Sequence, residues 1–517
     1  MRPGAPLRCP LILACLLALC GCAAQKVSDP LTDLRDPRLS ERDRERAIRA
    51  CWKQAEAGEI DRALVRDELK TMAWAGGWSP RLRLVAIRTL LGDTTPGADR
   101  DNRDFTRLKL PREPERRIVE ALSSAAAERG WSETTPALVR SLSRHWPGIP
   151  ERTRPEHAAL RALNPGRTVE QVVYDTFLHP PEEDAPVAVG GLRGVERVRV
   201  DAWDLLGRLD TEGTARAAML LDRQAPPTGP VADMRAALLE LRTLPVTGEE
   251  LRWLVSMRDF NDPAKAAWWK QASIAVSGLD PVRGGRLGLR HLEPIRWASL
   301  HRPEWIRAPR GELLHELRSR LEGRQLVRRR ASAEERWRPS PEGLRDWEAR
   351  LTWADLLTIL VIDEGLRDPA VVAALLAQAE MDRADTTAEY GGVLRAGDTA
   401  AESAGSAAAP VPPWRAIVYP PRPGNRRGDR EFVASADMIA QGDHSAAHYH
   451  FHAQDERNAD YAGPSPGDLA YAARLGRTCL VLTSVEKDAL NADLYQPDGV
   501  VLDLGTLRKP PAAAAGR

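Results

Sequence analysis

Net charge is almost absent from this chain of 517 residues, in which 74 Lys and Arg side chains stand against 73 Asp and Glu side chains. The chain therefore has no overall basic field that would attract nucleic acid and no acidic field that would repel it. Cysteine is also scarce, and four of the six cysteines lie within the first 22 residues. The other two, Cys51 and Cys479, are far apart in the sequence, which is a thin basis for a disulfide. We expect Cys479 to pack as a small hydrophobic side chain.

The apolar run over residues 11–19 is too short to span a bilayer, and it follows two Arg residues as an export signal does. It ends in Leu-Cys-Gly-Cys at residues 19–22, which resembles the bacterial lipoprotein signal. The resemblance implies a signal peptide over residues 1–22, with Cys22 lipidated and anchored in the membrane. A plain signal peptide or an uncleaved anchor is the alternative. We expect an exported lipoprotein on the periplasmic side of the inner or outer membrane.

A helical pattern follows, and residues 23–326 are expected to form an α-helical domain. Hydrophobic residues make up 43% of the chain, enough for a substantial core, and the length favours more than one domain. Apolar residues recur at three- and four-residue spacings, and Ser79-Pro80 is typical of a helix N-cap followed by Pro at the first helical position. Small central alanines recur at separations near forty residues or a multiple, at Ala86, Ala159, Ala202, Ala237 and Ala275. This region resembles a divergent HEAT-type α-solenoid, and an irregular helical domain is the alternative.

Many tryptophans lie in this helical region, among them Trp52, Trp74, Trp78, Trp203, Trp268 and Trp269. Interleaved with Arg, they could form a nucleic-acid or glycan surface. Core anchors between helices are the more common role. The expected export argues further against nucleic acid, so no nucleic-acid partner is expected.

The pattern changes after a charged, Pro-containing segment, which we interpret as a linker over residues 327–350. Residues 351–507 are expected to form a mixed α/β domain, and the tail over residues 508–517 to be disordered. One or two helices are expected over residues 351–382, with a further helix over residues 464–476. Strands are expected over residues 389–396, 414–420, 430–436, 445–452, 478–484 and 499–505.

Three histidines alternate in the expected strand over residues 445–452. Because side chains on a strand alternate between its faces, His448, His450 and His452 share one face and could reach one ion. A catalytic zinc site needs a third protein ligand and an open position, and Asp468 at the start of the next helix is a candidate. Ser465 and Asp468 also match a capping box, which is the more common meaning of that spacing alone.

Upstream of these histidines stands Glu389-Tyr-Gly-Gly-Val-Leu at the start of an expected strand. Together with His450-Phe-His452 and Ser465-Pro-Gly-Asp468, this order resembles the JAB/JAMM metalloprotease family, also called MPN+ domains. The resemblance implies a layered α/β fold like that of cytidine deaminases. It also implies Zn²⁺ held by His450, His452 and Asp468, Glu389 as the general base, and Ser465 as a donor to the oxyanion. The reaction implied is hydrolysis of a peptide or isopeptide bond.

Two departures from the family pattern stand beside this resemblance. Ala453 occupies the position after His-x-His where the family usually has Pro, and the gap from His452 to Ser465 is longer than usual. The pair His448/His450 is the alternative register, but it would lengthen the gap further.

We therefore expect an envelope-anchored zinc peptidase whose helical repeats dock a protein or peptide substrate. The alternative is a non-catalytic scaffold lipoprotein with a degenerate JAB-like domain. A third reading is a His-rich metal-binding protein, for which residues 444–452 would suffice.

Overall fold

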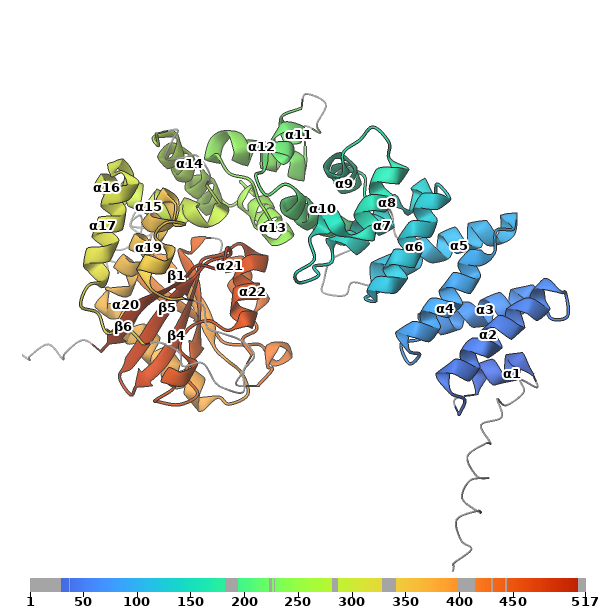
Figure 1. Cartoon of the computed structure of the whole chain (residues 1–517). Helices are drawn as coiled ribbons and strands as arrows, with labels where there is room; N and C mark the ends of the chain where they lie inside the picture. Colours follow the sequence, from blue (N-terminus) through green and yellow to red (C-terminus); the bar gives the residue numbers. More distant parts are fainter. Residues whose placement is uncertain are drawn as a thin grey trace, which may run out of the picture. The chain divides into compact units, whose positions relative to one another are not determined.

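The computed structural model describes residues 29–36, 38–181, 194–222, 226, 228–280, 287–327, 341–397, 414–428, 431–441 and 444–509 (Figure 1). The expected signal peptide with Cys22, residues 328–340 of the expected linker and residues 510–517 of the expected tail lie outside these ranges. Their predictions stay predictions. None of the helices in the described ranges has both the length and the apolar character needed to cross a bilayer.

The chain forms two compact units, divided between Val172 and Val173 within helix α9 (Val169–Leu178). The described residues of the first unit form helices linked by short turns. These helices are α1 (Pro30–Arg35), α2 (Glu41–Glu56), α3 (Arg62–Trp74), α4 (Pro80–Gly92), α5 (Pro96–Lys109), α6 (Arg116–Glu128), α7 (Thr135–Ser143) and α8 (Pro155–Leu163).

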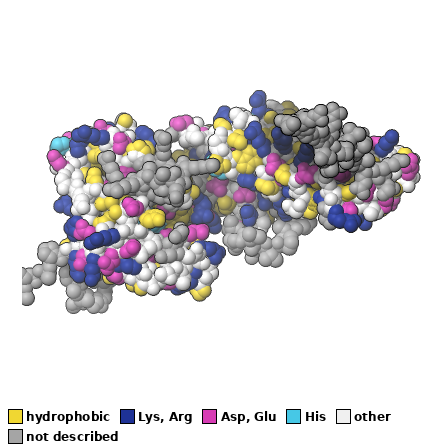
Figure 2. Space-filling view, turned by 60° about the horizontal axis from the view of Figure 1, so that its bottom comes forward, with side chains coloured by type: hydrophobic (Ala, Val, Ile, Leu, Met, Phe, Trp, Pro, Cys, Tyr) yellow, Lys and Arg dark blue, Asp and Glu magenta, His cyan; other side chains and the backbone are white. Residues whose placement is uncertain are grey.

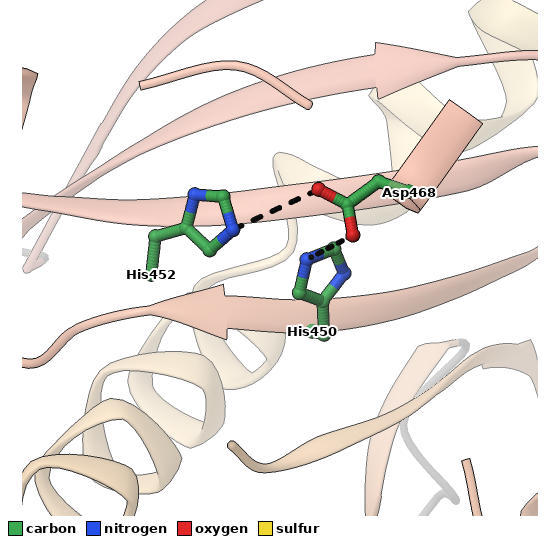
Figure 3. A group of neighbouring side chains, drawn as sticks. All are labelled: His450, His452 and Asp468. Atoms are coloured by element: carbon green, nitrogen blue, oxygen red, sulfur yellow. Dashed lines mark ion pairs between the residues drawn. The ribbon is translucent and has the colours of Figure 1, made fainter. Parts of the chain in front are cut away.

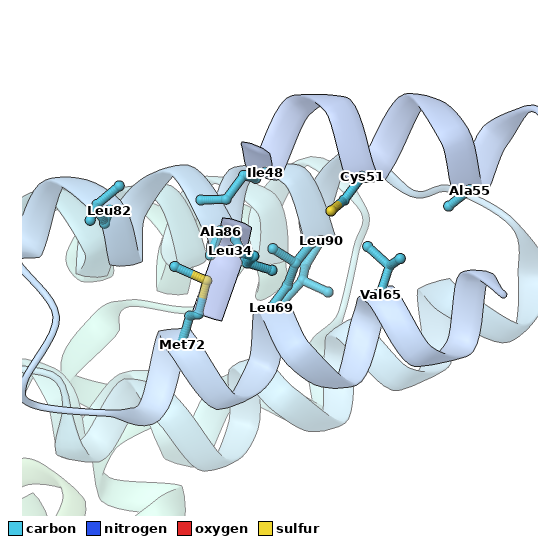
Figure 4. Close-up of a cluster of buried hydrophobic side chains, with 10 residues drawn as sticks. All are labelled: Leu34, Ile48, Cys51, Ala55, Val65, Leu69, Met72, Leu82, Ala86 and Leu90. Atoms are coloured by element: carbon cyan, nitrogen blue, oxygen red, sulfur yellow. The ribbon is translucent and has the colours of Figure 1, made fainter. Parts of the chain in front are cut away.

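Figure 4 shows the apolar core that α1 to α4 build, which includes Ile48, Cys51, Leu69 and Leu90. Cys51 is a free thiol buried in this core, and Cys479 in the second unit is likewise free and buried. Both therefore pack as hydrophobic side chains, as expected for Cys479. Ser79 caps α4 by accepting a hydrogen bond from the Leu82 main-chain N–H, which confirms the predicted helix start.

In the second unit, one group of helices precedes the first strand in the sequence, and a second group lies between strands in the sequence. The first group is α10 (Gly194–Leu209), α11 (Thr214–Leu221), α12 (Pro230–Leu241), α13 (Gly248–Met257), α14 (Pro263–Ser277), α15 (Leu292–His301), α16 (Pro303–Arg307), α17 (Arg310–Leu321), α18 (Leu344–Trp347), α19 (Trp353–Leu366) and α20 (Pro369–Ala384). The second group is α21 (Ala436–Gln441) and α22 (Pro466–Leu475). The expected helical region followed by a mixed α/β region is thus present.

The recurring alanines and most of the tryptophans are core residues. All five alanines are buried, in α4, α8, α10, α12 and α14. Trp203, Trp268 and Trp269 are buried, and Trp52 and Trp78 pack against the first core, whereas Trp74 is 40% exposed. Anchoring between helices is therefore the main role of these side chains.

Six strands form one mixed sheet in the order β2-β1-β3-β4-β5-β6. Their bounds are β1 (Gly391–Ala396), β2 (Trp414–Tyr419), β3 (Ala447–His452), β4 (Cys479–Glu486), β5 (Ala489–Tyr495) and β6 (Val501–Arg508). Only β3 and β4 run parallel, and α22 lies in the connection between them. All other neighbours are antiparallel.

Two strand predictions need correction. Residues 431–435 form no strand, because β1 is already paired with β2 and β3 on its two sides, and α21 follows directly. β5 was not predicted, because Asn491 and Asp493 are residue types that strands disfavour, yet both are fully buried in it.

The two faces of the sheet are covered by different helices. Tyr449 points to the face of α19 and α20, where its hydroxyl donates a 2.6 Å hydrogen bond to Gln378 in α20. Almost every residue of α19 is buried, as expected for a helix packed on several sides. α22 packs on the opposite face against Cys479, Val481 and Tyr495. The surface outside this core mixes acidic and basic side chains without a large patch of one sign on the face drawn in Figure 2.

Candidate metal centre

Two imidazoles from β3 and one carboxylate from α22 converge on the α22 face of the sheet (Figure 3). Nε2 of His450 lies 3.2 Å from Oδ1 of Asp468, and Nε2 of His452 lies 3.8 Å from Oδ2. The three ligand atoms all lie within 4.8 Å of one another. Two atoms at about 2.0–2.2 Å from a tetrahedral zinc lie roughly 3.3–3.6 Å apart, so the two distances to Asp468 lie on either side of the spacing expected around a small cation.

The alternation of β3 explains which histidines take part. His448, His450 and His452 point to the same face, but only the last two belong to the group with Asp468. His448 instead shares a 3.1 Å hydrogen bond through Nδ1 with the hydroxyl of Tyr471. Burial lowers the pKa of His448 to about 3, so this imidazole stays neutral. The structure therefore pairs His450 with His452.

Hydrogen bonds on the far side of both imidazoles fix their orientation. Nδ1 of His452 lies 2.8 Å from the carbonyl oxygen of Tyr461 and donates to it, which leaves the Nε2 lone pair of the neutral ring facing Asp468. Nδ1 of His450 lies 3.5 Å from the Tyr495 hydroxyl. Nε2 of His450 is buried and makes no hydrogen bond, although it lies beside the carboxylate. A buried imidazole nitrogen that lies beside a carboxylate and makes no hydrogen bond is suited to bind a metal ion.

Asp468 is both a helix cap and a member of the group. Its main-chain N–H donates to Ser465 Oγ at 3.2 Å, and its Oδ2 accepts from the Ser465 main-chain N–H at 2.7 Å. This is the complete capping box that the sequence allowed as an alternative. The cap holds the carboxylate at the helix start while Oδ1 faces His450, so the two interpretations of this motif are compatible.

The charges of the group are mutually dependent. Burial would raise the pKa of Asp468, but His450 and His452 outweigh it and hold that pKa well below its ordinary value. Burial lowers the pKa of His450, and the nearby carboxylates, Asp468 first, raise it to a net value above the ordinary one. The buried carboxylate thus requires a positive partner, and a bound cation would serve in place of a protonated imidazole.

Glu389 reaches the same face by strand periodicity. Gly391 pairs with His450 in β3, and continuing this antiparallel register places Glu389 opposite His452. Gln454 donates a 3.0 Å hydrogen bond to Oε1 of Glu389 and accepts a 2.7 Å bond from Asn458. Glu389 is only 5% exposed, and this bond helps to orient its buried carboxylate.

A cleft of about 960 Å³ opens over the group. Glu389, His452, Ser465 and Asp468 all line it, so four of the five residues predicted for the site share one solvent-accessible space. The fifth, His450, lies beneath it at 1% exposure. The ring of Phe432 stacks on His450 with a centroid separation of 5.0 Å.

The sequence did not indicate the residues that support this group. Gln454, Asn458 and the Tyr461 carbonyl come from the long segment between His452 and Ser465, which resembled an insertion. Polar side chains in a loop carry no periodic signal, and a main-chain carbonyl carries no residue-type signal at all. Phe432 lies in the segment that we expected to be a strand.

Comparison with known proteins gave no match: no family model, no curated protein and no solved structure resembles this chain. The geometry of the site therefore carries the functional argument.

Proposed function

We propose that this chain is a zinc-dependent peptidase of the JAB/JAMM type that hydrolyses a peptide or isopeptide bond. One observation carries the proposal: His450, His452 and Asp468 form a metal-sized group within reach of the cleft that Glu389 and Ser465 also line. A structural ion would not need an acid and a hydroxyl beside it in an open cleft.

The donor set favours zinc. Two imidazole nitrogens and one carboxylate oxygen, with the fourth direction open to a cleft, are the ligands of catalytic zinc sites. When bound there, zinc would supply a water of lowered pKa, so that hydroxide is available near neutral pH.

Glu389 is proposed to act as the general base and then as the acid. Its carboxylate would accept a proton from the attacking water and transfer it to the leaving amine. The hydrogen bond from Gln454 to Oε1 helps to hold the carboxylate in place. Because the side chain is almost fully buried, little motion competes with this orientation.

Ser465 is proposed to stabilise the oxyanion. Its Oγ accepts the Asp468 main-chain N–H, which fixes the oxygen at the helix start and leaves its O–H free to donate. Losing one such donor typically lowers the rate by about 10²–10³.

The rest of the proposal concerns setting. We propose that the six-stranded unit has a JAB-like fold and that the buried alanines belong to a HEAT-like solenoid that docks a protein or peptide substrate. With Cys22 lipidated, the enzyme would act at the envelope, on substrates exposed there. A scaffold without catalysis remains the second candidate because Ala453 departs from the family pattern.

The test measures zinc content and peptide cleavage for the full-length protein without its signal peptide. We expect the wild type to bind zinc stoichiometrically and Asp468→Ala to lose it. Glu389→Gln should retain zinc but no longer cleave peptides. Zinc without cleavage of a broad peptide library would favour the scaffold. If Asp468→Ala binds as much zinc as the wild type, the metal is held by a simple His cluster and the proposed site is refuted.

A further inference from the structure

The cleft continues from the metal-sized group along one face of α22. Gly467, Ala470, Tyr471 and Arg474 line it, and their spacing of i, i+3, i+4 and i+7 places them on one side of the helix. The first two are small and exposed, so they leave room for a bound main chain along the helix.

Arg474 is the only Lys or Arg among the described residues that line this cleft. No described acidic side chain forms an ion pair with it, although Glu389, Glu431 and Asp468 line the same cleft. Its guanidinium lies over the ring of Tyr471, 5.9 Å from the ring centroid, and this contact limits where it can point. An exposed guanidinium at the edge of a cleft, without an acidic partner, is suited to an anionic part of a ligand.

The position of Arg474 sets the distance from the group to this cation. Arg474 follows Asp468 by six positions, which is a rise of about 9 Å along the helix axis. Helical side chains lean toward the helix N-terminus, so the guanidinium reaches back toward Asp468. An extended peptide spans about 3.3–3.6 Å per residue, so roughly two residues fit between the two points.

We propose that Arg474 forms a subsite for a substrate carboxylate about two residues from the scissile bond. The position relative to a cleaved bond rests on the proposed peptidase function. Binding of a carboxylate in the cleft does not depend on that function and can be measured separately. The carboxylate could be the C-terminus of a short peptide or an Asp or Glu side chain, since both present the same two oxygens to a guanidinium.

The first measurement is binding to the full-length protein, with and without added zinc. The probes are N-acetyl-tetra-alanine as the free acid, the same peptide amidated, and an amidated version with Glu at its third position. We expect the free acid or the Glu peptide to bind about tenfold more tightly than the plain amide, as for a hydrogen-bonded ion pair. Whichever of the two binds more tightly identifies the source of the carboxylate.

Arg474→Gln should abolish this preference and leave affinity for the plain amide unchanged. The matched control is Arg474→Gln combined with Ala473→Arg, which restores a cation to an exposed position of α22 that does not line the cleft. We expect the preference to stay absent in this control. A preference that persists in Arg474→Gln, or that returns in the control, would overturn the subsite, as would equal binding of all three probes or no binding at all.

Cleavage of the same probes separates this inference from the proposed function. Carboxylate-dependent binding without cleavage by the zinc-loaded protein would leave the subsite standing and refute the peptidase. Cleavage that ignores the carboxylate would support the peptidase and refute the subsite. If both hold, Arg474→Gln should raise KM about tenfold for the favoured probe with kcat unchanged, since the guanidinium lies away from the reacting atoms.

Discussion

Replacing Asp468 by Asn separates its role as a helix cap from its role as a metal ligand. Asn keeps an oxygen that can accept the Ser465 main-chain N–H, and the reciprocal bond to Ser465 Oγ involves only the main chain of residue 468. It removes the negative charge that faces His450 and His452. Asp468→Ala removes the charge and also the side-chain half of the capping box, in which Oδ2 accepts the Ser465 main-chain N–H.

The expected magnitude follows from linkage between zinc binding and folding. Zinc at 1,000 times its Kd stabilises a folded state by about 4.1 kcal/mol. Loss of a residue that only supports a ligand costs 10–100-fold in metal affinity, so loss of a ligand should cost about 100-fold or more. The stabilisation by zinc should then fall by about 2.7 kcal/mol, or about 5 °C in Tm for a unit of this size.

The assay is thermal unfolding of the full-length protein in a chelator and at a fixed free zinc concentration. We expect a zinc-induced rise in Tm for the wild type and a rise only about one third as large for Asp468→Asn. In the chelator, Asp468→Ala should be less stable than Asp468→Asn by about 1 kcal/mol, which is the net value of the one hydrogen bond from the Ser465 main-chain N–H that Ala cannot accept. An equal zinc-induced rise in the wild type and in Asp468→Asn would refute the ligand role of this carboxylate.

Three further outcomes test other parts of the structure. Gln454→Leu should lower kcat about tenfold or more with zinc content unchanged, because Glu389 loses the bond that orients it; unchanged kinetics would contradict this. Burial raises the pKa of Asp204 to about 6 from an ordinary 3.8, so the contribution of this side chain to stability is greatest below about pH 4 and is lost as the pH rises through 6. Asp204→Asn should therefore stabilise the protein by about 2–3 kcal/mol above pH 6 and not at pH 3, as measured by denaturant unfolding. Gly392→Ala would force a Cβ against the main chain of the neighbouring strand and should cost about 1–3 kcal/mol, whereas Gly424→Ala, with open space around it, should change stability by less than about 0.5 kcal/mol.

The convergence of the ligands could be predicted because it depends on periodicity. Alternation along a strand determines that His450 and His452 share a face, whatever surrounds them. Ser465 and Pro466 mark a helix start, which places Asp468 in the first turn. Because the helix follows the strand in the sequence, a connecting loop is enough to bring Asp468 to the face of the strand that carries the two histidines.

The remaining features depend on contacts distant in sequence, which residue patterns do not encode. Asn491 and Asp493 are tolerated in β5 because Asn491 donates to Asp503 in β6 and the Gly463 main-chain N–H donates to Asp493. Neither bond can be predicted before the fold is known. Phe432 lies in a β-like run, but the ring of His450 and the space above Gly391 offer it a better site than another strand would.

The long segment between His452 and Ser465 shows how a departure from a family pattern can support the chemistry that it seemed to weaken. Because a longer loop constrains the position of Asp468 less, its length alone weakens the prediction that Asp468 lies beside the imidazoles. In the structure, however, Asn458 bonds to the main chain of Ser484 and of His452, which ties the start of the segment to two neighbouring strands. This anchoring brings the Tyr461 carbonyl to His452 and the Gln454 amide to Glu389. Because one segment orients both a metal ligand and the proposed base, a shift of the segment would change metal affinity and proton transfer together.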